Sequence, residues 1–401
     1  AARAVFAEAD ALERAGQTEK AAERYRAVVA AGGERRFRAA LRLAAQNVSA
    51  GRNEDAIGLY ASVATNAAAT LDERVDAHAG RGRANYRAYR FRDARADFGK
   101  VAELAPSRAD EMRFLKALCL YGEGGDADAK AEALDLFGKT GDAALKADLS
   151  LWLAKWCYNH REWRESQSHY EAYAAHARGE KGADALTWAA RCASACGDDA
   201  KAVELTTRAV KAAPDAPFLA DVLLVQGEAL MELARFAEAV IVFDRVKTAA
   251  PSDEAARRAA IRRADALYAL GADNTARYAD ALKAYQDLGK TAALTPSERI
   301  ATAYRVGRLL EKMNRKDEAE DQLYANVVLA WRDARAKGAV FDENACRCFA
   351  QAAFKLSENY AAAGDAFAAA AVLKLVVDSG TASAKEASRR LEQFEKKGFV
   401  R

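Results

Sequence analysis

The chain has 401 residues, of which 51% are hydrophobic and 30% charged, and its formal net charge at pH 7 is +3. This hydrophobic content is ample for a core and excludes a disordered chain, while the net charge is too small to indicate nucleic acid or an anionic membrane. The chain opens AARAVFAEAD, without a methionine or a signal peptide, so we expect the natural protein to begin upstream. No apolar run approaches the about 18–20 residues that span a bilayer, so we expect no membrane span.

Along the chain, a small residue is followed four positions later by a large one. The clear pairs, in chain order, are Ala21/Tyr25, Ala56/Tyr60, Ala94/Phe98, Ala133/Phe137, Ala239/Phe243 and Ala281/Tyr285. Weaker copies begin at Ser166, Ala202, Ala319 and Ala369. Successive copies begin 33 to 50 residues apart, a spacing typical of stacked helical repeats.

Glycine and proline recur in the same register. Twelve residues before the small residue stand Gly82, Gly227 and Gly307, and twelve after it stand Pro106, Pro214 and Pro251. Five residues before it stand Gly16, Gly51, Gly197, Asn314 and Gly364. A small residue lets two helix axes cross closely, a glycine accepts the left-handed conformation that ends a helix, and a proline prevents the second helix from continuing.

This order of small residue, alanine, ring and proline resembles the tetratricopeptide repeat, in which each repeat forms two antiparallel helices and a turn. The resemblance implies an all-α fold: a right-handed α-α superhelical solenoid of about ten helix pairs, running as a single domain over residues 1–401. We expect a long turn after Tyr121, about five extra residues in the turn after Gly271, and a long linker over 330–345. A polar final helix over 382–397 would cap the stack. The expected repeats are 3–33, 36–69, 74–107, 110–142, 147–180, 183–215, 220–252, 255–293, 298–332 and 345–378.

No pattern of catalytic, metal-binding or cofactor-binding residues stands out. Cys157 and His160 share a helix face and could contribute to a zinc site, but structural zinc needs four converging ligands, so we expect ordinary buried and surface side chains there. The glycine-rich stretch at Gly122 lacks the GK[ST] ending of a phosphate-binding loop. We therefore expect no catalytic residue, metal or cofactor, and a chain that is not an enzyme. The close pairs Cys192/Cys196 and Cys346/Cys348 are expected to be thiols, because cysteine packs as a small hydrophobe.

The resemblance implies a binding groove lined by the first helix of each repeat, on the face opposite its buried small residue. Carried over by register, the groove residues are Arg83, Tyr86, Arg87, Arg90, Lys155, Tyr158, Asn159, Arg191, Glu228, Met231, Tyr268, Tyr304 and Arg308. Arg83, Arg87 and Arg90 form a basic stripe, which an acidic peptide could bind through bidentate guanidinium contacts; a solvated helix face is the alternative. Four of the five tryptophans crowd into residues 152–188, either as a binding hot spot or as repacking of that repeat.

We therefore expect a non-enzymatic scaffold that binds a protein or peptide, possibly an acidic one, and not nucleic acid, with a monomer favoured. The alternative is an accessory region of a larger enzyme or of a secretion or polysaccharide-export system. The repeat period, longer than 34 residues, and the junction AAPSDEAARRAAIRRADALYALG are similar to repeats of bacterial cell-envelope proteins. That similarity implies the periplasm or cell envelope, with the cytoplasm as the alternative.

Overall fold

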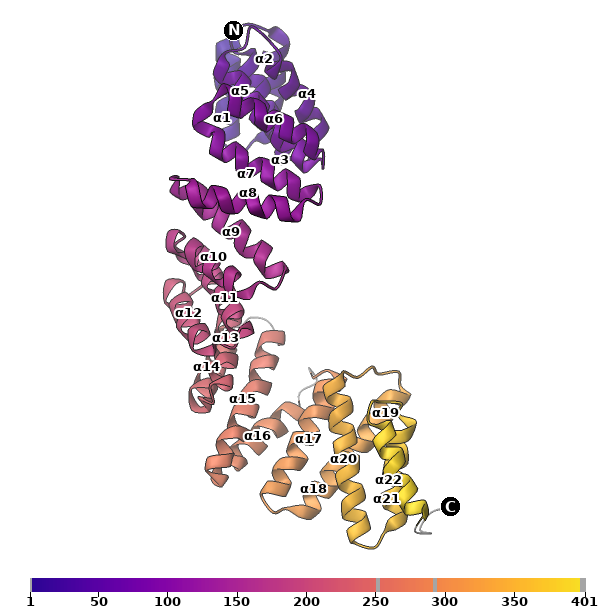
Figure 1. Cartoon of the computed structure of the whole chain (residues 1–401). Helices are drawn as coiled ribbons and strands as arrows, with labels where there is room; N and C mark the ends of the chain where they lie inside the picture. Colours follow the sequence, from indigo (N-terminus) through magenta and orange to yellow (C-terminus); the bar gives the residue numbers. More distant parts are fainter. Residues whose placement is uncertain (1, 250–252, 291–293, 397–401) are drawn as a thin grey trace. The chain divides into compact units, whose positions relative to one another are not determined.

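In the computed structural model, the chain is described over residues 2–249, 253–290 and 294–396, and this part is helical without any strand (Figure 1). It divides into two compact units, Ala1–Ala177 and Arg178–Arg401. The all-α fold expected from the repeats is confirmed, because consecutive helices pack against each other within each unit. The single solenoid over 1–401 stays a prediction, and each unit is described by itself.

Unit 1 holds five helix pairs. Each first helix packs against the second helix of its own pair and of the preceding pair, and α3 also contacts α5. The helices are α1 (Ala2–Arg14), α2 (Thr18–Ala31), α3 (Arg36–Ser49), α4 (Asn53–Ala64), α5 (Leu71–Arg87), α6 (Phe91–Leu104), the short η1 (Pro106–Arg108), α7 (Ala109–Gly122), α8 (Asp126–Lys139), α9 (Ala143–Asn159) and α10 (Trp163–His176).

Unit 2 continues the same pattern and ends on an additional helix, α22, which packs on α21 in the position expected of the cap. Its elements are α11 (Gly179–Ala195), α12 (Asp199–Ala212), α13 (Leu219–Glu232), α14 (Phe236–Ala249), α15 (Asp253–Asp273), η2 (Thr275–Arg277), α16 (Tyr278–Gly289), α17 (Pro296–Lys312), α18 (Lys316–Leu323), η3 (Tyr324–Leu329), α19 (Ala330–Ala336), α20 (Glu343–Ala362), α21 (Ala366–Asp378) and α22 (Ala384–Lys396). Pro251 and residue 397, which the sequence analysis used, lie outside the described residues.

The glycine of the first helix makes room for a large side chain of its partner helix. A Cβ added at Gly82 would lie 2.6 Å from the Phe98 ring, and one at Gly227 would lie 2.4 Å from the Phe243 ring. Both rings are about 1% exposed. The ring four residues after the alanine therefore closes its own helix pair, and only a residue without a Cβ allows that approach.

The turn inside most pairs contains a residue with positive φ, five positions before the repeated small residue. Glycine or asparagine fills this position at Gly16, Gly51, Gly197, Asn314 and Gly364, as the sequence predicts. Tyr89, Arg161 and Ala234 adopt the same conformation, with φ of 61°, 60° and 55°. The backbone hydrogen bonds of the turn impose the left-handed conformation there even without glycine.

The fourth pair corrects the predicted register. Gly124 has the positive φ of the turn, and five residues later Ala129 is the fourth residue of α8 and fully buried. The prediction placed Ala133 there because Phe137 follows it, but Ala133 is one helical turn further along the same face. The turn after Tyr121 is therefore as short as the others, and the long turn expected there was wrong.

The linker expected over 330–345 is partly helical. Residues 324–329 form a π-helical segment, and α19 continues to Ala336, so only 337–342 connect to α20. Trp331 explains this, because its indole is 3% exposed and stacks on Phe349 with ring centroids 4.1 Å apart. Its other neighbour, Phe341, lies 5.3 Å away. Burial of the indole stabilises the helix over 330–336, which the sequence spacing alone does not indicate. The extra residues after Gly271 form η2.

Candidate ligand-binding hollow

The first helices of unit 1 surround a hollow of about 540 Å³, here named the arginine hollow. Side chains from α1, α3 and α5 line it, together with one residue of α4 and one of η1. Its lining contains five arginines and two aspartates, so cationic groups dominate it. The lining residues are Phe6, Asp10, Arg35, Arg38, Leu41, Arg42, Tyr60, Asp76, Ala79, Gly80, Arg83 and Arg108.

Three of these arginines come from one face at the start of α3. Arg35, Arg38 and Arg42 are spaced three and four residues apart, which places them together on a helix surface. Arg35 stacks over the Phe6 ring at 5.5 Å, and Arg42 lies 3.9 Å from Glu13, at the limit of an ion pair. Arg38 is exposed and has no hydrogen-bond or ion-pair partner within the part of the chain that the structure describes. Arg38 therefore lines the hollow without a close carboxylate from the described chain, whereas the pKa of the Glu34 carboxyl is lowered by its hydrogen bond to Arg3 and also by the nearby Arg35.

The other two arginines share a single acidic residue. Arg83 donates to Glu111 at 3.0 Å, and Arg108 donates to the same carboxylate at 2.9 and 3.1 Å. One negative charge thus sits between two guanidinium groups. The pKa of Arg108 is raised by its hydrogen bond to Glu111, so this residue remains cationic at any physiological pH.

The floor of the hollow contains a tyrosine hydroxyl. A Cβ at Gly80 would lie 2.3 Å from Tyr60 Cζ and 2.8 Å from the Tyr60 hydroxyl oxygen, so the tip of this ring occupies the space of a side chain at position 80. Tyr60 is only 6% exposed. Burial raises the pKa of Tyr60, the nearby Arg83 opposes this shift, and the nearby Asp76 adds to it. The hydroxyl is therefore protonated near neutral pH and can donate a hydrogen bond.

The predicted groove residues of repeat three are already engaged within the chain. Arg83 lines the hollow, but Arg87 donates to the Val48 carbonyl at 3.3 Å, and Arg90 pairs with Glu54 at 2.7 Å. Tyr86 packs edge-on against Phe91 with centroids 5.4 Å apart. The stripe Arg83, Arg87 and Arg90 thus also joins α5 to its neighbouring repeats.

In repeat five, the structure keeps only part of the predicted set exposed. Tyr158 packs edge-on against Trp163 at 5.1 Å, as Tyr86 packs on Phe91, so it closes its own helix pair. Lys155 and Asn159 are exposed on α9. None of the three lines the arginine hollow.

In unit 2, the predicted residues are mostly tied to close neighbours. Arg191 stacks over Trp188 at 4.5 Å, Tyr268 packs against Tyr278 at 5.9 Å, and Arg308 pairs with Glu311 at 2.7 Å. The side chain of Met231 packs against the core, and burial raises the pKa of Tyr304.

Glu228 lines a second hollow in unit 2, of about 240 Å³, bounded by α13, α15, α17 and α20. The charges in this hollow are largely compensated. Glu228 lies 3.4 Å from Arg258, and Asp265 lies 3.0 Å from Arg305.

The candidate metal pair does not gain further ligands. No group of three or more His, Cys, Asp or Glu side chains is arranged to hold a metal ion among the described residues. Cys157 is buried, and burial raises its pKa to about 12. His160 stacks on Trp156 at 3.7 Å, with its Nδ1 2.8 Å from the Trp156 carbonyl oxygen. All six cysteines are free thiols, and no described helix is both long enough and apolar enough to cross a membrane.

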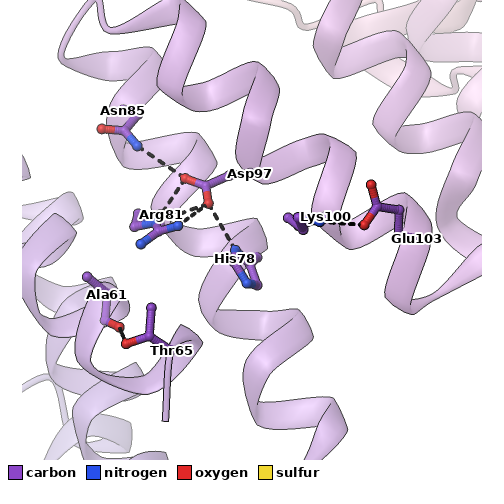
Figure 2. A network of polar contacts seen from close by, with 8 residues as sticks. All are labelled: Ala61, Thr65, His78, Arg81, Asn85, Asp97, Lys100 and Glu103. Atoms are coloured by element: carbon purple, nitrogen blue, oxygen red, sulfur yellow. Dashed lines mark hydrogen bonds and ion pairs between the residues drawn. The ribbon is translucent and has the colours of Figure 1, made fainter. Parts of the chain in front are cut away.

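A buried carboxylate joins α5 to α6 (Figure 2). Asp97 is 3% exposed, and Arg81 contacts it with two nitrogens at 2.6 and 3.0 Å. His78 Nδ1 lies 2.9 Å away, and Asn85 donates at 3.2 Å. His78, Arg81 and Asn85 are spaced along one face of α5, so all three converge on one acceptor. This cluster is internally satisfied and stabilises the pair instead of presenting groups to a ligand.

Sequence reasoning missed Arg35, Arg38 and Arg42. In the repeat family, the groove positions stand eleven, eight and seven residues before the repeated small residue. In repeat two, Ala45 occupies the first of these positions. Arg42 and Arg38 stand fourteen and eighteen before Ala56. Their spacing in RRFRAALR was the available signal, since it gathers three cations on one face of a first helix.

No protein-family model and no curated protein matches the sequence. Among solved structures, the chain is similar to the C-terminal part of a TPR repeat-containing protein from Cytophaga hutchinsonii, with 14% identity over 68% of this chain and 98% of that one, at a TM-score of 0.47. It is also similar to the apo form of RapI, with 11% identity over 84% and 99% of the two chains and a TM-score of 0.48. A tetratricopeptide repeat protein from Parabacteroides merdae is 12% identical over 64% and 96%, with a TM-score of 0.41.

These similarities concern the fold and are distant. The helix pairs themselves carry the assignment: the repeated small residue is the fourth residue of each second helix, and the following ring lies against a glycine of the first helix at Gly82 and Gly227. Over the described residues, the chain is an all-helical repeat protein built from stacked helix pairs.

Proposed function

We propose that this chain is a non-enzymatic scaffold that binds an acidic segment of a partner protein in the arginine hollow. The observation that carries the proposal is the convergence on one hollow of five arginines, three from the start of α3, one from α5 and one from η1. Arginine is suited to this role because its planar guanidinium matches a carboxylate with two hydrogen bonds. A hollow of about 540 Å³ accommodates several residues of an extended segment, so that more than one acidic side chain can be bound.

The local balance of charge favours an acidic ligand over a neutral one. Arg38 has no acidic partner in the described chain, and Arg42 has only a distant one. Because guanidinium groups brought close together repel each other, an incoming carboxylate relieves repulsion as well as forming hydrogen bonds. Arg83 and Arg108 hold Glu111 between them, an example within the chain of one carboxylate bound by two guanidinium groups.

Calorimetric titration with an N-acetylated, C-amidated hexaglutamate peptide tests this proposal. The combined change Arg38→Ala and Arg42→Ala is expected to weaken binding by about 1–3 kcal/mol, as for hydrogen bonds to charged groups. The difference should shrink at high salt, since these cations are exposed to solvent. The matched control removes two exposed arginines from second helices of the same unit, Arg26→Ala and Arg92→Ala. Equal losses in both double variants would indicate nonspecific attraction and contradict the proposal.

We propose further that the protein acts in a bacterial cell envelope. The support for this is the similarity of its repeat period and of the junction after Pro251 to repeats of envelope proteins. A reporter fusion tests this location. The complete gene is expressed in its own host, fused to an enzyme that is active only outside the cytoplasm. An inactive reporter on a full-length fusion would contradict it.

A further inference from the structure

The floor of the arginine hollow differs from an ordinary repeat packing in one respect. Gly80 stands fourteen residues before the repeated alanine of its pair, as Arg42 does in the preceding pair, and both line the hollow. The glycine that the repeat requires is Gly82, whose space the Phe98 ring fills. Gly80 is therefore an additional glycine on the lining face, and the ring of Tyr60 enters its side-chain space from α4.

This arrangement brings the hydroxyl of a largely buried tyrosine to the surface of the hollow. Tyr60 is 6% exposed, and within the described residues no group accepts a hydrogen bond from its hydroxyl. Asp76 lines the same hollow without forming that bond. The ring of Tyr60 is buried, but its hydroxyl oxygen is not one of the buried polar atoms without a partner and reaches the solvent of the hollow, so a ligand can replace water as its acceptor.

Two other tyrosines in the same repeat position show which acceptor suits this hydroxyl. The Tyr25 hydroxyl donates to Asp10 at 2.6 Å and to Glu13 at 2.9 Å. The Tyr285 hydroxyl donates to Asp265 at 2.5 Å. In each case the chain itself supplies a carboxylate from a first helix.

The Asp265 carboxylate also shows how arginine completes such a contact. It accepts from Tyr285 and pairs with Arg305 at 3.0 Å, so a phenol and a guanidinium bind one carboxylate together. Around Tyr60, Arg42 and Arg83 line the hollow. Burial raises the pKa of the Tyr60 hydroxyl, and the nearby Asp76 adds to this shift without accepting its hydrogen bond.

We infer that Tyr60, exposed beneath Gly80 and flanked by Arg42 and Arg83, forms a subsite for one Asp or Glu side chain of the bound segment. The inference rests on the proposed function and adds a specific donor to it. Arginines at the rim attract the acidic segment, and the hydroxyl at the floor fixes one carboxylate by a short hydrogen bond. A carboxamide cannot replace that carboxylate, because it lacks the charge that the guanidinium groups compensate.

The test compares Tyr60→Phe with the wild-type full chain in titrations with acetyl-hexaglutamate-amide and acetyl-hexaglutamine-amide. Loss of the hydroxyl should weaken hexaglutamate binding about tenfold, and hexaglutamine should bind neither protein. Phenylalanine keeps the ring beneath Gly80, so the melting temperature should be unchanged. The matched control is Tyr89→Phe, which removes a hydroxyl from an exposed turn outside the hollow and should leave affinity unchanged.

The outcomes separate this inference from the proposed function. If Tyr60→Phe binds hexaglutamate as tightly as wild type while the Arg38 and Arg42 double variant loses affinity, the Tyr60 subsite is refuted. The proposal that the arginine hollow binds acidic segments is then still supported. If wild type does not bind hexaglutamate, both fail. Two further peptides, hexaserine with a free C-terminus and a phosphoserine peptide, test other anions. If either binds in a way that depends on Tyr60 while hexaglutamate does not bind, the bound anion is a terminal carboxylate or a phosphate. The assignment to an Asp or Glu side chain is then wrong.

Discussion

At the scale of single residues, carboxylates decide how this molecule is held together. Asp97 and Asp265 are each surrounded by donors from neighbouring helices, whereas exposed pairs such as Lys100 and Glu103 lie on the surface of one helix. Buried ionic groups cost desolvation and are tolerated only when every lone pair is used. The chain therefore uses shielded carboxylates to join neighbouring helices.

Replacing Asp97 tests this role. Asp97→Ala leaves Arg81 without its buried partner, so we expect a loss of about 3–5 kcal/mol in the free energy of unfolding. In the control Glu103→Ala, drawn beside it in Figure 2, an exposed pair is lost, at a cost of about 0–1 kcal/mol. Urea unfolding followed by circular dichroism measures both. Similar midpoints for the two variants would show that the buried cluster adds no stability.

At the scale of elements, the turn between paired helices keeps its left-handed residue whichever side chain occupies it. Ala234 has a φ of 55° and is followed after five residues by Ala239, so it occupies the position that Gly16 and Gly51 occupy in other pairs. An alanine is strained in this region by about 1–2 kcal/mol. The surrounding helices impose the conformation against this local preference.

The change Ala234→Gly should therefore stabilise unit 2. Relief of strain outweighs the greater freedom of glycine in the unfolded chain, which offsets about 0.4–1 kcal/mol, and a net gain of about 0.5 kcal/mol is expected. The same substitution three residues later, Ala237→Gly, lies exposed in the first turn of α14, where no positive φ is relieved, and should destabilise by up to about 1 kcal/mol. Thermal unfolding of both variants gives the sign directly. A loss of stability at position 234 would contradict the account of the turn.

The elements also show how far the sequence could predict this structure. Small residues at a fixed spacing predict helix pairs, because close packing demands them wherever two helices cross, as at Gly82 and Gly227. The register failed at Ala133, since Ala129 lies on the same helix face and periodicity cannot choose between two alanines one turn apart. It failed again at 330–336, where burial of Trp331 against the distant Phe349 stabilises the helix and no local pattern records that contact.

At the scale of the whole molecule, the sequence predicts the type of candidate site, a groove lined by first helices, but not most of the residues that form it. Repeat logic indicates that first helices line a groove, and it identifies Arg83. It does not reveal that Arg87 and Arg90 are occupied by contacts with neighbouring repeats, or that Arg38 and Arg42 remain available. Which arginines are compensated depends on acidic groups brought near them by folding, so this part of the answer requires the structure.

The central claim is that acidic ligands bind the first-helix surface of unit 1 and not the second helices. Nuclear magnetic resonance of the arginine Nε–Hε groups, recorded during titration with acetyl-hexaglutamate-amide, tests it most directly, since the side chains that meet carboxylates report their own contacts. The account predicts shifts at Arg38, Arg42 and Arg83, and none at Arg26 and Arg92 on second helices. Shifts concentrated on Arg26 and Arg92, or spread evenly over both surfaces, would contradict it.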